Sequence, residues 1–238
     1  MNFKQIIDDL IAATHSLSFS APVTHVYNPL VYARKPHDLY WQHFGQLQAP
    51  TMLLGMNPGP WGMVQTGVPF GEIPAVRDWI GITGPVGKPA NAHPKRPVEG
   101  FGCTKSEVSG RRLWGWARKS FGRPDTFFKH FFVVNYCPLV FMEAGGRNRT
   151  PNNLPAVEKK PLMAACDQAL QRTVDLLRPK RVIGIGAFAE QRARAALSGY
   201  DVGIGRITHP SPANPKANKG WEGVIATELE GMGIGHRA

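Results

Sequence analysis

The sequence predicts an α/β fold, a three-layer α/β/α sandwich around a central, mostly parallel, four-stranded sheet. Three observations predict it. Short apolar runs rich in Val, Ile, Leu or Phe alternate with longer segments of helical periodicity. The apolar runs lack polar alternation, which is typical of parallel strands buried on both faces. The resulting β-α-β-α order places helices on both sides of one sheet.

The strands are expected at residues 51–56, 131–137, 181–186 and 202–208. Helices with apolar faces are expected at 1–17, 109–121, 157–177 and 187–197. Residues 58–106 are the exception, because they hold much of the Gly and Pro and show only a short helix near 74–80. A loop region of that length inside a compact domain is usually either functional or disordered. We predict one domain over residues 1–238.

The composition limits the function and the compartment. The formal net charge of +11 suits an anionic partner such as nucleic acid, although charge alone does not identify one. Cys103, Cys137 and Cys166 form no C-x-x-C pair, which argues against a disulfide framework and a zinc or iron–sulfur site. No apolar run has the length of a membrane span, and the acidic N-terminal segment is not a signal peptide. We therefore expect a cytoplasmic protein without metal or membrane contact, nucleoid-associated if bacterial, with no nuclear targeting signal.

Three predicted strands end in polar side chains, namely Asn57, Asn135 and His209. Taken singly, an Asn there is most often a turn former, and a His a hydrogen-bonded filler. In open α/β sheets, however, the ligand lies beyond the carboxyl ends of the strands. The sequence therefore predicts that the three side chains converge on one cleft, which would contain two amides, one imidazole and no carboxylate.

The segment HPSPANPKANKGW, at residues 209–221, is rich in turn-forming residues. Lys216, Lys219 and backbone amides are available to phosphates, and Trp221 is expected to anchor the return into a helix. The segment is either a polar surface loop with two solvated lysines or a nucleic-acid clamp. Its direct attachment to His209 favours the clamp.

Several motifs carry a family resemblance. They are GMNPGPWGMVQTGVPFGE at 55–72, SEVSGRR-W at 106–114, NYCPL at 135–139, GRN-TP at 146–151, AEQRARAAL at 189–197 and HPSPANPKANKGW at 209–221. Together they resemble the single-strand-selective monofunctional uracil-DNA glycosylases, a branch of the uracil-DNA glycosylase superfamily. The resemblance implies an enzyme that flips uracil out of DNA and hydrolyses its N-glycosidic bond without cutting the strand. We expect a monomer that acts without a cofactor on single- and double-stranded DNA containing uracil, and on 5-hydroxymethyluracil or other deaminated bases.

The resemblance also implies roles for single residues. Asn57 would hold the attacking water, and His209 would donate a hydrogen bond to O2 of the departing uracil. Asn135 would recognise N3–H and O4 of the base, and Phe70 would stack on it. The other implied substrate contacts are backbone groups of Met56 and Gly59 and the side chain of Met63, which would shape the pocket around uracil C5.

The loop after His209 would bind DNA. The implied contacts are Ser211, Pro212, Ala213, Asn214, Lys216 and Lys219. In animal members of the family, an arginine at the position of Ala213 wedges into the duplex and fills the gap left by the flipped base. Alanine is too short for that role, so part of this plug is expected to be missing.

Two alternative functions remain open. GIGAFA at 184–189 resembles the G-x-G-x-x-A dinucleotide fingerprint, although the expected acid is misplaced. A NAD-linked oxidoreductase is therefore the less favoured enzyme class. Close packing of a helix on a strand is the preferred interpretation of these glycines. A non-catalytic single-strand binder could instead stack bases on Trp61, Phe70, Trp114 and Trp116. For Trp114 and Trp116, simple core packing of an amphipathic helix is the preferred interpretation.

Overall fold

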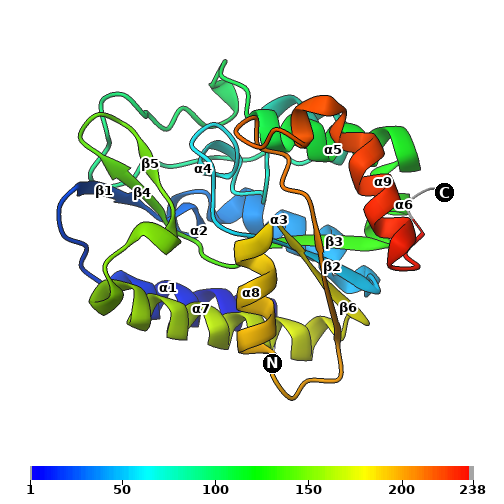
Figure 1. Ribbon diagram of the computed structural model, residues 1–238. Coiled ribbons are helices and arrows are strands. Elements are labelled where there is room, and N and C mark those ends of the chain that lie inside the picture. Colours follow the sequence, from blue (N-terminus) through cyan, green and yellow to red (C-terminus); the bar gives the residue numbers. More distant parts are fainter. Residues whose placement is uncertain (1, 236–238) are drawn as a thin grey trace.

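The computed structural model describes residues 2–235, and its centre is a four-stranded parallel sheet (Figure 1). The strand order is β3-β2-β6-β7, with β2 at Thr51–Gly55, β3 at Phe131–Asn135, β6 at Arg181–Ile185 and β7 at Gly203–Ile207. All four predicted strands are present, each one or two residues shorter than expected. β2 and β3 are almost entirely buried, in agreement with their continuous apolar runs.

Helices cover both faces of the sheet, which confirms the three-layer prediction. α1 (Phe3–His15), α7 (Ala156–Leu177) and α8 (Ala187–Ala196) lie on one side, and α5 (Val108–Phe121), α6 (Pro124–Phe128) and α9 (Trp221–Gly231) on the other (Figure 1). The helix expected after the last loop begins at Trp221, whose Nε1 donates to Thr208 O at 2.7 Å. Within residues 2–235, no helix combines the length and apolar character needed to cross a membrane.

A second, smaller sheet was not predicted. It is antiparallel, in the order β1-β4-β5, and consists of β1 (Val23–Tyr27), β4 (Val140–Glu143) and β5 (Asn148–Arg149). β4 and β5 are four and two residues long, too short for a periodicity to stand out, and β1 (VTHVY) lacks the continuous apolar run of a buried strand. The helices α2 (Pro29–Tyr32), α3 (Arg34–Phe44) and α4 (Met63–Thr66) and the 3-10 turns Gly45–Leu47, Gly100–Gly102, Pro151–Asn153 and Ala217–Lys219 were also not predicted.

The segment of residues 58–106 is irregular but packed. Besides α4, it contains a π-helical turn at Ala75–Ile80, close to the short helix expected near 74–80. The buried side chain of Gln65 holds its parts together. Gln65 Nε2 donates to Pro60 O and Pro97 O, both at 3.0 Å. Its Oε1 accepts from the backbone N–H groups of Glu99 and Gly100, at 2.9 and 3.1 Å.

The core on the α5 side is largely aromatic. Trp114 and Trp116 are 1% and 2% exposed and contact Phe127 ring to ring. Core packing of an amphipathic helix is therefore the correct reading of these two tryptophans, and neither is available to stack a DNA base.

Candidate active site

A cavity of about 330 Å³ lies beyond the carboxyl ends of β2, β3 and β7. Its lining residues are Met56, Asn57, Pro58, Gly59, Phe70, Glu107, Ser109, Asn135, Asn148, Thr150, His209 and Ser211. The structure therefore brings together the three polar side chains that follow the strands, Asn57, Asn135 and His209. Met56, Gly59 and Phe70 also line the cavity, and the resemblance implied all three as substrate contacts.

Asn57 follows β2, and its amide is fixed by one hydrogen bond. Nδ2 donates to the carbonyl oxygen of Leu139 at 3.1 Å. Because this hydrogen bond fixes Nδ2 toward Leu139 O, the acceptor Oδ1 is the group that Asn57 offers to a ligand or a water molecule. This orientation suits a residue that holds a water by accepting its hydrogen bond.

Asn135 ends β3 directly opposite Gly55 of β2. A Cβ on Gly55 would lie 2.3 Å from Asn135 Oδ1 and 2.6 Å from the Phe70 ring, so only glycine leaves room for this arrangement. Asn135 Nδ2 donates to Met63 Sδ at 3.2 Å, whereas Oδ1 is buried and has no hydrogen-bond partner among the described residues. An unpartnered buried acceptor is costly unless a ligand supplies the donor.

Met63 lies behind Asn135 and does not line the cavity. Its side chain is 3% exposed and orients the Asn135 amide, because a thioether sulfur can accept a hydrogen bond but cannot donate one. In the free protein its contact is thus with the amide that would recognise the base.

Phe70 has a left-handed backbone with φ of 54°, which is strained for an aromatic residue. Two contacts from α5 hold it in place. Trp114 Nε1 donates to Phe70 O at 3.0 Å, and Gly110 approaches so closely that a Cβ there would lie 2.1 Å from the same oxygen. The Phe70 ring centroid is 6.1 Å from that of His209, so the two rings form adjacent walls of the cavity.

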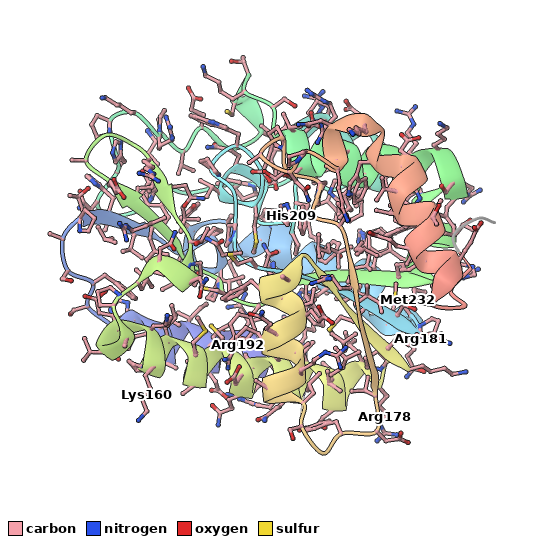
Figure 2. The ribbon with its side chains drawn as sticks, in the orientation of Figure 1. Lys160, Arg178, Arg181, Arg192, His209 and Met232 are labelled. Atoms are coloured by element: carbon pink, nitrogen blue, oxygen red, sulfur yellow. The ribbon has the colours of Figure 1, made fainter. Side chains whose placement is uncertain are left out.

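His209 lies two residues past β7, near the amino end of α8 (Figure 2). The backbone N–H of Ser211 donates to His209 Nδ1 at 3.0 Å, so Nδ1 is the acceptor and the neutral ring carries its proton on Nε2. Burial lowers the pKa of His209 to about 4. At neutral pH the ring is therefore an uncharged donor through Nε2.

The expectation that the cleft contains no carboxylate is wrong. Glu107 lines the cavity from the N-cap position of α5, and burial raises the pKa of its carboxyl to about 7. Sequence reasoning missed it because it considered only strand ends, whereas Glu107 precedes a helix. Ser109, Asn148 and Thr150 were also missed as lining residues, although SEVSGRR and GRN-TP had marked both segments.

The loop after His209 has a defined shape. Asn214 N donates to Ser211 O at 3.0 Å, and Lys216 N donates to Asn214 Oδ1 at 3.1 Å. Arg112 of α5, which sequence reasoning did not single out, donates to Pro210 O and Asn218 Oδ1, both at 2.9 Å. Ser211 reaches the cavity. Pro212, Ala213, Lys216 and Lys219 are exposed, and Asn214 is half-buried.

The residues available in the site are neutral donors and acceptors together with one carboxyl. Within residues 2–235, no group of three or more His, Cys, Asp or Glu side chains could hold a metal ion. The arrangement can bind a planar, polar ring between Phe70, Asn135 and His209 and can hold a water at Asn57.

Comparisons with known proteins agree on one family. The model of the uracil DNA glycosylase superfamily matches residues 42–227. The single-strand selective monofunctional uracil DNA glycosylase of Mus musculus is 49% identical over 94% of this chain and 81% of its own length. The Rattus norvegicus protein of that name is 50% identical over 94% and 82%, and the Bos taurus protein 50% over 92% and 81%.

One solved structure supports the fold. The crystal structure of wild-type SMUG2 from Pedobacter heparinus superposes with a TM-score of 0.64, at 16% identity, over 95% of this chain and 96% of that one. The family model spans most of the chain, and the relatives are about half identical over nearly all of it. The chain therefore belongs to the uracil-DNA glycosylase superfamily, and within it to the single-strand selective monofunctional uracil-DNA glycosylases.

Proposed function

We propose that this protein is a DNA repair enzyme that flips uracil out of DNA and hydrolyses its N-glycosidic bond, leaving an abasic site and an intact strand. One observation carries the proposal: in a single cavity, Asn57 offers an acceptor, His209 a neutral donor and Asn135 an unpartnered acceptor, beside the ring of Phe70. A flipped base is recognised through its Watson–Crick edge and by stacking, which these groups supply.

Bond cleavage then needs little proton transfer. As the N-glycosidic bond breaks, the sugar becomes cationic and the uracil anionic. His209 Nε2–H donates to O2 and stabilises the anion, and its low pKa keeps the ring neutral. Asn57 Oδ1 accepts a hydrogen bond from water and holds it for attack on the cationic carbon. An amide suffices here, because water attacking a cation needs positioning more than deprotonation. The proton that the water releases as the new C–O bond forms neutralises the uracil anion, so the products are free uracil and an abasic site.

Asn135 supplies the selection between uracil and cytosine. Uracil N3–H can donate to the unpartnered Oδ1, and Nδ2 can donate to uracil O4. Cytosine presents an acceptor at N3 and a donor at N4. It would therefore set acceptor against acceptor at Oδ1 and donor against donor at Nδ2. The Met63 contact at Nδ2 favours the uracil orientation, since a rotated amide would place oxygen against sulfur.

The alternative functions are less well supported. Gly184 packs against α8, where an added Cβ would lie 2.3 Å from Glu190 N, and Gly186 has φ of 93° beside His209. Both glycines thus have a packing reason that needs no dinucleotide. A silent single-strand binder would not need the oriented amide and imidazole, and Trp114 and Trp116 are buried.

We also propose a DNA partner, an oligomeric state and a cellular compartment for the protein. The +11 charge and the exposed Lys216 and Lys219 favour single- and double-stranded DNA containing uracil. We propose that the protein acts as a monomer, because one chain supplies every residue that lines the cavity, and in the cytoplasm, because Cys103, Cys137 and Cys166 are free. Sedimentation with and without DNA would test the monomer.

The decisive experiment is release of free base from a labelled oligonucleotide. The purified protein should release uracil from a uracil-containing strand and leave the strand uncut until alkali is added. A matched thymine strand is the control. Binding without release of uracil would identify the silent binder. Strand scission without alkali, together with a covalent protein–DNA complex trapped by borohydride, would identify a lyase that uses an amine.

A further inference from the structure

Glu107 carries the one ionisable side chain of the cavity that the mechanism above leaves unused, within the described residues. Its Oε2 is buried and has no hydrogen-bond partner in that part of the chain. Removing a carboxyl from water without full hydrogen bonding costs stability, so its presence here calls for a function.

The carboxyl lies against the backbone of the turn that begins at Asn57. A Cβ added to Gly59 would lie 1.9 Å from Glu107 Oε2, and one added to Gly62 would lie 2.6 Å from it. The carboxyl therefore occupies the space that side chains at these positions would take. Burial raises the pKa of this carboxyl, and the nearby backbone of Trp61 and Gly62 counters part of that rise by favouring the charged form.

Within the described residues, the Asn57 side chain has one hydrogen bond, to Leu139 O. The turn that follows Asn57 is held by Gly62 N donating to Gly59 O at 3.4 Å and by Gln65 Nε2 donating to Pro60 O at 3.0 Å. The Glu107 carboxyl packed against Gly59 and Gly62 adds a further anchor, from the start of α5.

We propose that Glu107 is a positioning residue for base excision: its carboxylate anchors the turn of residues 57–62 and thereby holds the Asn57 amide where it can orient the attacking water. This inference rests on the proposed function. It assigns Glu107 an effect on the chemical step and none on recognition of the base, because Phe70, Asn135 and His209 have anchors of their own.

Burial and the neighbouring charges set the pKa of Glu107 near neutral pH. Burial is the main cause of its raised pKa, about 7, and the neighbouring Glu72 carboxyl adds to it. Arg111 is held by Ser106, which also donates to Glu72. Arg96 and Lys105 lie over the Trp61 ring, and His209 faces the cavity as a neutral ring.

The rate of uracil release should depend on the ionisation of Glu107. Above pH 7 the charged carboxylate attracts the backbone N–H dipoles of Trp61 and Gly62, and below pH 7 protonation weakens this attraction. The single-turnover rate of uracil release from a single strand should therefore rise about tenfold through pH 7, the equivalent of one charge-assisted hydrogen bond. The affinity for uracil-containing DNA should not change with it.

The test compares four proteins between pH 5.5 and 9. We expect Glu107→Gln to be slow throughout, about tenfold below wild type at pH 8, without the inflection and with unchanged affinity. Glu107→Asp keeps the charge and should keep the inflection. Glu99→Gln, which neutralises an exposed glutamate outside the cavity, is the matched control and should behave as wild type.

A Glu107→Gln enzyme with wild-type rate and inflection would overturn the inference, and so would an equal loss of rate and DNA affinity. Should Glu107→Gln not fold, Glu107→Asp decides, because a flat profile in that variant contradicts a role of the charge. A wild-type protein that releases no uracil at any pH refutes the proposed function itself, which keeps the two failures distinct.

Discussion

Single side chains in this cavity are held by contacts that set which atom faces the ligand. For Asn57, the bond from Nδ2 to Leu139 O leaves Oδ1 for water. We expect Asn57→Ala to fold and to bind uracil DNA, while the glycosidic step slows by roughly 10² or more, the effect of losing a preorganised polar group. Binding and single-turnover assays on one uracil oligonucleotide measure both quantities. Equal losses in binding and cleavage would contradict the assignment.

His209 acts earlier in the reaction than Asn57, since the leaving group departs before water attacks. His209→Ala should therefore slow single-turnover excision at least as much as Asn57→Ala. The pKa of about 4 also gives the direction of the pH dependence of the rate. The neutral ring is the working form, so the contribution of His209 is constant above pH 5 and is lost as the pH falls through 4. A near-normal rate in His209→Ala would show that the anion is stabilised elsewhere.

Asn57, Asn135 and His209 could be predicted from the sequence because the ends of parallel strands meet at one edge of a sheet. Glu107 could not, because its approach to Gly59 and Gly62 depends on how α5 packs against a long irregular loop. The left-handed Phe70 was equally hidden, since its strain is maintained by Trp114 and Gly110, which are distant in sequence.

At the scale of elements, α5 is the support of the cavity wall. Gly110→Ala would place a Cβ 2.1 Å from Phe70 O and must shift either the helix or the strained Phe70. We expect it to lower uracil excision by at least tenfold and to destabilise the protein by about 1–3 kcal/mol. Excision kinetics and denaturant unfolding measure the two effects.

Gly115 of the same helix is the matched control. Nothing lies within 4 Å of an added Cβ there, so Gly115→Ala should keep full activity and gain up to about 1 kcal/mol from helix propensity. If the two variants behaved alike, the contact between Gly110 and Phe70 would have no importance for the site.

The loop after His209 is an element whose shape is set and whose tip is short. Ala213 is exposed, and the family resemblance implies an arginine wedge at this position, which alanine is too short to supply. A longer side chain would help most where a partner base must be abandoned. We expect Ala213→Arg to raise excision from a U:A duplex more than from a single strand, measured as kcat/KM on both. Equal effects would show that another residue fills the gap.

The helices α1, α5, α7 and α8 and the four strands of the central sheet followed from apolar patterns and were located to within a few residues. α3 was missed, although its 11 residues exceed the 10 of α8, and so were most of the short elements. β4 and β5 are defined by pairing with each other and with β1, a long-range contact that four- and two-residue segments do not reveal.

For the whole molecule, the buried titrating groups oppose one another. His37 and His209, with pKa values of about 4, destabilise the fold as the pH falls below 6.5, because the unfolded chain then binds more protons. Glu107 does the reverse. Its pKa is raised from 4.5 to about 7, so its cost appears as the pH rises from 4.5 and is complete above 7.

A stability measurement separates this cost from catalysis. A shift of that size corresponds to on the order of 3 kcal/mol, so Glu107→Gln should unfold at a higher temperature than wild type at pH 8, with the difference fading toward pH 4.5. Calorimetry across this range tests it, with Glu99→Gln as control. A Glu107→Gln variant that is less stable at pH 8 would show that the carboxylate supports the fold.

Four hydrogen bonds of a single side chain, Gln65, hold the long segment before α5 together. One side chain links two stretches, around residue 60 and residues 97–100, so opening either stretch breaks hydrogen bonds of the same side chain. The segment should therefore exchange its amide protons as one cooperative unit, although most of it has no regular structure. Residues 81–96 lie between the bonded stretches and do not line the cavity, so insertions there should leave the cavity unchanged.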